Sequence, residues 1–266
     1  MLENLMNDSV PKCENRMSGD NQQEKYLSYV IGVYFGDGYT GLNHGGIKAR
    51  FFRLEVIDKD FRDFAAQSCD IAFPDYHTTR FEHIKSEKKY YGLQVRGIGT
   101  YLETVTGKRR FIPNFVYTND DNKRMFVEGM MDSEAWISIN VSKSGNTIHG
   151  RFGFAITSEI IHELARLLSQ LNVKYGKIST FTKNRKKPLK TITLHIPSFL
   201  DAGLKFHIER KQSKLEKFKM IREIVGSTYK ERCSFREQNP GLIKRMVCSE
   251  LHGDMKKLAE MTSSVQ

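Results

Sequence analysis

Residues 29–38 read YVIGVYFGDG, and residues 126–135 read FVEGMMDSEA. Aligned without gaps, both stretches begin with an aromatic residue and valine, have glycine fourth and a small residue eighth, and place an acid ninth. These acids, Asp37 and Glu134, are 97 positions apart (134 − 37). Because the apolar residues run without a turn signal until the acid, we predict that each stretch is a short buried helix ending near its acid.

Small residues in both stretches are spaced for close packing of two helices. Gly32 and Gly36 are four apart, as are Gly129 and Ser133, so each pair lies on one helical face. A face without side-chain bulk lets two helix backbones approach each other. We therefore predict that the two helices pack against each other.

The acids have an unfavourable position on the predicted helices. A carboxylate at a helix C-terminus is disfavoured by the helix dipole, and two carboxylates brought together need a cation to compensate them. A hard divalent metal is the natural one. The pattern predicts a metal-dependent active site on a pseudo-twofold axis with Asp37 and Glu134 as ligands. We expect Asp132, two residues before Glu134, to have a capping or solvated role.

The elements after each motif repeat in the same order. Each half is predicted as αββαββα, an α+β unit with a four-stranded antiparallel sheet covered by helices on one side. We expect a disordered leader at 1–23, the first repeat at 24–115, the second at 116–225 and a helical C-terminal extension at 226–266. In the first half, two predicted strands flank a glycine-rich turn at Gly41, Gly45 and Gly46, and the second of them ends in 52–56; two further strands span about 76–84 and 90–95. The predicted strands of the second half comprise 137–142, 152–156, 177–182 and 189–196, and the predicted helices comprise 61–69, 100–105 and 160–171.

The two motifs resemble those of single-chain LAGLIDADG homing endonucleases. The resemblance implies two pseudo-symmetric LAGLIDADG subdomains and site-specific double-strand cleavage of a long DNA target that leaves short 3′ overhangs. It also implies two or three Mg²⁺ ions near Asp37 and Glu134, with one acid serving each strand. Ala135 departs from the family's usual glycine, which threatens the local turn. Catalytic lysines implied by the resemblance are Lys108 in the first half and either Lys205 or Lys211 in the second.

Alternation in the predicted strands defines a polar sheet face. Ser138 and Asn140 alternate with isoleucines, as do Thr193 and His195 with Ile192, Leu194 and Ile196. Such side chains read base edges in a DNA major groove. We expect DNA contacts on these faces and on the basic turn 183–187. The full set of expected DNA-binding residues is Arg62, Gln94, Arg96, Ser138, Asn140, Lys183, Arg185, Lys187, Thr193 and His195.

The bulk properties favour a polyanionic partner. The chain of 266 residues has 42 Lys and Arg against 31 Asp and Glu, a formal net charge of +11. Its four cysteines lack a metal-binding spacing, and no apolar run is long enough to span a membrane. We expect a soluble, intracellular monomer that binds double-stranded DNA.

Three alternatives belong to other functional classes. An RNA maturase, assisting splicing of its host intron, would keep the fold, bind intron RNA and need neither acid. A DNA-binding regulator of the same fold would also need neither. An intein is disfavoured, because residue 1 is not a nucleophile and the sequence ends in Ser264-Val265-Gln266.

Overall fold

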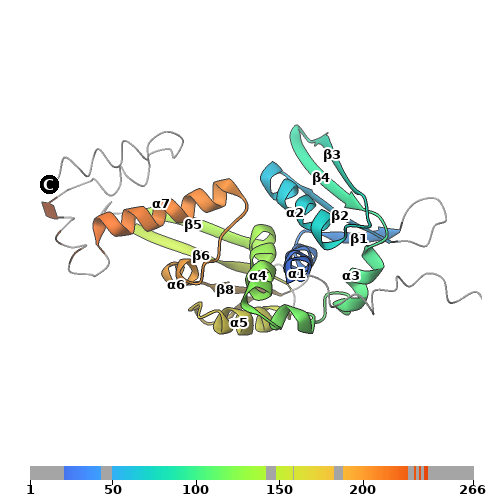
Figure 1. Cartoon of the computed structure of the whole chain (residues 1–266). Helices are drawn as coiled ribbons and strands as arrows, with labels where there is room; N and C mark the ends of the chain where they lie inside the picture. The colour runs from blue at the N-terminus through green and yellow to red at the C-terminus, as the bar shows by residue number, and fades with distance from the viewer. Residues whose placement is uncertain are drawn as a thin grey trace, which may run out of the picture. The chain divides into compact units, whose positions relative to one another are not determined.

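The computed structural model describes residues 21–42, 50–141, 148–157, 159–182, 188–226, 231, 234 and 237–238. Its contacts divide the chain into two compact units, 1–133 and 134–266. Each unit contains a four-stranded antiparallel sheet (Figure 1), as expected for the α+β class. Most of the expected leader and C-terminal extension lies outside the described residues. None of the helices in the described part is long and apolar enough to cross a membrane.

The first unit follows the predicted order of elements. Its sheet has the order β1-β2-β4-β3. The elements are α1 (Asn21–Phe35), β1 (Tyr39–Leu42), β2 (Arg50–Val56), α2 (Lys59–Ala72), β3 (Thr78–Lys85), β4 (Lys88–Val95), α3 (Gly99–Val105), the 3₁₀ helix η1 (Asn114–Tyr117) and α4 (Asp120–Glu134).

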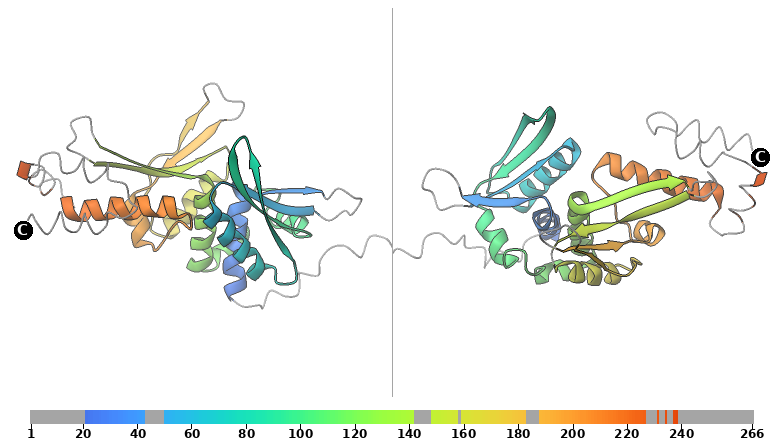
Figure 2. Two further views of the ribbon diagram at one scale, coloured as in Figure 1. Left: turned by 90° about the horizontal axis from the view of Figure 1, so that it is seen from above. Right: turned by 180° about the vertical axis from the view of Figure 1, so that it is seen from behind.

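One face of the first sheet forms the core of the unit. Phe52 and Leu54 on β2 and Leu93 on β4 are fully buried, and their neighbours in sequence point to the other face. Helix α2 lies along the buried face of β2 and β4 (Figure 2) and contributes Phe61 and Cys69 to the core. The opposite face of this sheet, which points away from α2, does not belong to this core.

The second unit repeats this sheet topology, with the order β5-β6-β8-β7. The predicted strand at 189–196 is wrong at its end, because α6 starts at Ile196 with His195 as its N-cap and a proline in its first turn, where a missing N–H costs nothing. The elements are β5 (Ala135–Val141), β6 (Ile148–Ile156), α5 (Ile161–Gln170), β7 (Ser179–Phe181), β8 (Leu189–Thr193), α6 (Ile196–Asp201) and α7 (Glu209–Val225).

The core of the second unit is rich in aromatic side chains. The Phe152 ring contacts those of Phe199 on α6 and Phe206, with centroids 4.9 and 5.6 Å apart. Gly150 leaves room for the Phe218 ring of α7, which a Cβ at residue 150 would meet at 2.4 Å. These contacts place α6 and α7 on one face of the sheet and leave Ser138 and Asn140 on the other.

The two compact units meet in sequence at the end of α4. The repeat boundary expected between residues 115 and 116 concerns the duplication in the sequence, and it stays a prediction. The boundary by contacts comes later, after residue 133, because α4 packs against α1 within the first unit.

Candidate functional site

Helices α1 and α4 cross at two glycines, as the motifs predict. A Cβ atom on Gly32 would lie 2.3 Å from the Phe126 carbonyl oxygen, and one on Gly129 would lie 2.3 Å from the Tyr29 carbonyl oxygen. Only glycine allows backbones to approach this closely. The two glycines have equivalent surroundings, so the crossing is pseudo-twofold symmetric.

The two helices run parallel. Near their N-termini, Asn119 Nδ2 lies 3.4 Å from the Asn21 amide oxygen, and Lys25 Nζ lies 3.7 Å from Asp121 Oδ2. The crossing then brings residues 29–33 against residues 126–130. The C-terminal ends of α1 and α4 therefore point the same way, and each candidate acid follows its crossing glycine by five positions.

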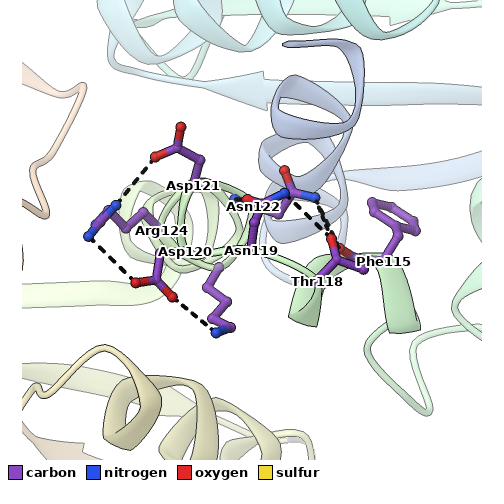
Figure 3. A network of polar contacts seen from close by, with 8 residues as sticks. Phe115, Thr118, Asn119, Asp120, Asp121, Asn122 and Arg124 are labelled. Atoms are coloured by element: carbon purple, nitrogen blue, oxygen red, sulfur yellow. Dashed lines mark hydrogen bonds and ion pairs between the residues drawn. The ribbon is translucent and has the colours of Figure 1, made fainter. Parts of the chain in front are cut away.

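A polar network fixes the start of α4 (Figure 3). The Asn119 side chain accepts a hydrogen bond from the Asn122 backbone N–H at 2.8 Å, in the manner of an N-cap. The Asn122 side chain donates to the Phe115 carbonyl at 3.0 Å, which ties α4 to η1. Asp120 and Asp121 occupy the first turn, where the helix dipole favours acids.

The turn that carries Asp37 is held by backbone and side-chain contacts. The N–H of Gly38 donates to the Val33 carbonyl at 3.0 Å. The Arg109 guanidinium donates to the Gly38 carbonyl and lies over the Tyr34 ring, 4.4 Å from its centroid. The Asp37 side chain itself is exposed. Arg109 thus anchors the residue directly after the candidate metal ligand.

Arg109 reaches this turn because residues 107–109 adopt a left-handed backbone. The φ angles of Gly107, Lys108 and Arg109 are 54°, 57° and 68°, and the Arg109 N–H donates to the buried Thr106 hydroxyl at 3.2 Å. Lys108, the residue expected from the resemblance, is exposed in this turn. Arg109 was not among the expected site residues, although it belongs to the run of basic residues at 108–110.

The second motif meets its sheet without a turn. Glu134, the last residue of α4, is half-buried, and Ala135 begins β5 directly. Ala135 is buried and pairs with Phe154 in the strand register. Because no turn lies at this position, the expected disruption of a turn by Ala135 is wrong.

The expected capping or solvated role for Asp132 is wrong. This residue is 1% exposed and accepts a hydrogen bond of 2.7 Å from the Tyr29 hydroxyl of α1. Burial, and next the Asp132 charge, raise the pKa of Tyr29 well above its ordinary value. The contact therefore keeps Tyr29 a neutral hydrogen-bond donor inside the helix pair.

The described residues contain no group of three or more His, Cys, Asp and Glu side chains that could hold a metal ion. Mg²⁺ does not require such a cage, because it commonly binds one or two carboxylates and completes its shell with water and substrate phosphates. The carboxylates of Asp37 and Glu134, both with solvent access, fit this donor chemistry.

The two candidate lysines of the second half differ in exposure. Lys205 is exposed after α6, whereas Lys211 is 8% exposed in the first turn of α7. The Lys211 ammonium lies 5.4 Å from the centre of the Phe206 ring. Of the two lysines, Lys205 is therefore the one accessible to a phosphate.

The open face of the first sheet carries a network centred on Glu55, which the sequence analysis did not anticipate. Glu55 pairs with Arg53 at 2.5 Å and His83 at 3.6 Å, and it accepts a hydrogen bond from the Tyr39 hydroxyl at 3.3 Å. Expected base-reading residue Gln94 lies on the same face, opposite Arg53.

Stacked rings extend this network along β3 and β4. The His83 ring stacks on those of Phe81 and Tyr90, with centroids 6.1 and 5.5 Å apart. Phe81 lies over Gly92, where a Cβ would be 2.2 Å from the ring. The expected contact Arg96 lies just beyond the end of β4 and is exposed.

The structure gives Arg62 a different role from the expected DNA contact. Its side chain is 6% exposed and pairs with Asp63 at 2.6 Å. The guanidinium also reaches the carbonyls of Phe81 and Gly92, at 3.4 and 3.5 Å. Arg62 therefore ties α2 to the hairpin of β3 and β4.

The open face of the second sheet contains the predicted polar residues. Ser138 and Asn140 alternate on β5 with the half-buried Ile137 and Ile139, and the Asn140 amide donates to the Ser138 hydroxyl at 2.7 Å. Thr193 on β8 is exposed, and Trp136 lies on the same face as Ser138. The expected contacts Lys183, Arg185 and Lys187 lie outside the described residues.

His195 is not a strand residue. Its Nδ1 atom accepts a hydrogen bond of 3.3 Å from the Ser198 N–H, capping α6. Although the side chain is exposed, the cap occupies one ring nitrogen and fixes the orientation of the ring. The expectation that His195 projects from the strand beside Thr193 is therefore wrong, because His195 caps α6.

Comparisons with known proteins give similarity to solved structures only. No family model and no curated protein matches the chain. A complex of I-DmoI with DNA and Mn is 13% identical, with a TM-score of 0.47, over 67% of this chain and 94% of that chain. The LAGLIDADG homing endonuclease I-GzeII with its DNA target is 12% identical, with a TM-score of 0.46, over 80% of this chain and 98% of that chain.

A third similar structure is full-length DUF199/WhiA from Thermatoga maritima. It is 14% identical, with a TM-score of 0.48, over 82% of this chain and 67% of that chain. The similar structures thus include the family that the motifs resemble.

Proposed function

We propose that this chain is a monomeric, Mg²⁺-dependent homing endonuclease that cuts both strands of a specific DNA duplex. The observation that carries the proposal is the parallel crossing of α1 and α4 at Gly32 and Gly129. Asp37 follows α1, and Glu134 is the last residue of α4; each acid lies five positions after the crossing glycine of its helix. Asp37 and Glu134 then each serve one strand.

The acids have the chemistry that phosphodiester hydrolysis requires. Their carboxylates would hold Mg²⁺, which when bound lowers the pKa of water and neutralises charge on the phosphate. The Arg109 guanidinium holds the turn after Asp37 in place. Lys108 and Lys205, both exposed, would neutralise the phosphate that each half contacts.

The open faces of the two sheets are the proposed DNA-reading surfaces. Gln94, Ser138, Asn140 and Thr193 present amides and hydroxyls, which hydrogen-bond base edges. The formal net charge of +11 favours phosphate contacts, so binding should weaken steeply with salt. Arg96, at the end of β4, is an exposed candidate for such a contact.

Selection of cleaved sites from a randomised duplex library with Mg²⁺ tests this function. The expected result is one long consensus target, cut on both strands to leave short 3′ overhangs, with no cleavage when EDTA replaces Mg²⁺. Failure to cut any duplex would contradict the proposal. Binding of an intron RNA without DNA cleavage would instead indicate the maturase, which shares the fold and needs neither acid.

A further inference from the structure

The crossing of α1 and α4 is symmetric in its backbone but not in its side chains. Residues 97 positions apart are equivalent, as Gly32 and Gly129 are. The contact between Tyr29 and Asp132 therefore has a symmetry-related counterpart between Phe126 and Phe35. The structure contains both contacts, and their chemistry differs.

One contact is polar and the other is apolar. The Tyr29 hydroxyl donates to Asp132 at 2.7 Å, and the two residues are 0% and 1% exposed. The rings of Phe35 and Phe126 meet edge to face, with centroids 5.8 Å apart and planes at 73°. An edge-to-face pair adds stability beyond its buried area. In the native pair, the buried hydroxyl therefore has a carboxylate partner, and each phenylalanine ring has an aromatic partner.

Pairing of like helices would break both matches. Two copies of α1 would place Tyr29 against Phe35 twice, leaving the buried hydroxyl without the carboxylate. Two copies of α4 would place Asp132 against Phe126 twice, so the carboxylate would lose the hydroxyl and face an apolar ring. Burying polar groups without the bonds they make in the native pair is costly. Only α1 with α4 satisfies both contacts.

We propose that these four side chains specify pairing of α1 with α4 and act against pairing of like helices from two copies of the chain. Because α1 and α4 belong to one chain, their high effective concentration then favours the intramolecular pair. The inference depends on the helix crossing alone and stands whether or not the chain is a nuclease.

Three full-length variants test the proposal by reproducing the mismatched pairs inside one chain. Tyr29→Phe with Phe35→Asp gives α1 the two side chains of α4. Phe126→Tyr with Asp132→Phe gives α4 those of α1. All four substitutions together move the hydroxyl to position 126 and the carboxylate to position 35, which restores one polar and one apolar contact on exchanged sides.

Denaturant unfolding of these variants gives the readout. Each double variant should lower the folding equilibrium constant by about 10- to 100-fold, the effect of one or two mismatched buried polar groups. The quadruple variant should be at least about tenfold more stable than additive losses predict. Tyr26→Phe, which removes a hydroxyl from a half-buried position of the same helix, should leave the constant nearly unchanged.

Two outcomes would overturn the proposal. The first is that both double variants are as stable as the wild type. The second is that the quadruple variant shows no recovery beyond additive losses. If a double variant does not fold, cooperative unfolding of the quadruple variant still supports the proposal, and its failure to fold contradicts it.

Discussion

Gly32 of α1 and Gly129 of α4 occupy equivalent positions, and a Cβ on either would lie 2.3 Å from a carbonyl oxygen of the other helix. Backbone cannot move aside as a flexible side chain can. Gly32→Ala or Gly129→Ala should therefore lower the free energy of unfolding by about 1–3 kcal/mol or more, measured by denaturant titration.

Ser133→Ala is the matched control for these glycine variants. Ser133 shares the small-residue face of α4, but its hydroxyl bonds back to the Gly129 carbonyl of the same helix at 3.1 Å. The change adds no bulk, so stability should shift by less than about 1 kcal/mol. If the glycine variants were as stable as Ser133→Ala, the close crossing would be wrong.

Arg109 should support cleavage without contributing to DNA affinity. Its guanidinium holds the Gly38 carbonyl beside Asp37, so Arg109→Ala should misplace that acid and slow cleavage by about 10- to 100-fold, the usual effect of losing a residue that orients a metal ligand. Single-turnover cleavage and a binding titration would separate the two effects. The neighbouring exposed residue offers the control Arg110→Ala, and equal rates for both variants would argue against the anchoring role.

Two arginines should respond in opposite ways to alanine substitution. Arg62→Ala removes a buried side chain that pairs with Asp63 and bridges α2 to the hairpin, so it should lower the free energy of unfolding by about 1–3 kcal/mol. Arg96→Ala, at an exposed position, should leave stability unchanged while reducing the salt dependence of DNA binding by about one phosphate contact. If Arg62→Ala instead weakened DNA binding without lowering stability, the expected DNA contact of Arg62 would be restored.

The single tryptophan of the chain provides a direct probe of the second sheet. Trp136 lies on the open face of β5, beside Ser138. If that face contacts DNA, saturating a target duplex should change the emission of Trp136, and Trp136→Phe should abolish the signal. Unchanged emission at full binding would place the DNA elsewhere.

The sequence predicted features that depend on local pattern and on duplication. The glycine spacing predicted the helix crossing, and period-two alternation predicted the open face that carries Ser138 and Asn140. Both follow from the geometry of one element. The paired motifs added the expectation of two matching sheets, which the strand orders confirm.

The remaining features depend on residues distant in the sequence. Arg62 is buried against the hairpin of β3 and β4, where the carbonyls of Phe81 and Gly92 accept its hydrogen bonds. Asp132 is buried against Tyr29, which lies 103 positions away in sequence but is adjacent in space. Helical spacing alone reveals neither partner. Arg109 was missed because a left-handed backbone at three consecutive residues cannot be inferred from their side chains.

The most direct test of the central claim is strand-resolved cleavage of the selected target by Asp37→Asn and Glu134→Gln with Mg²⁺. Each variant should bind the duplex like the wild type but cut at least one strand more than about 100-fold more slowly, because each loses a metal-binding carboxylate. Glu87→Gln, the same chemical change at an exposed hairpin turn, should cut both strands normally. Full double-strand cleavage by Asp37→Asn would contradict the account.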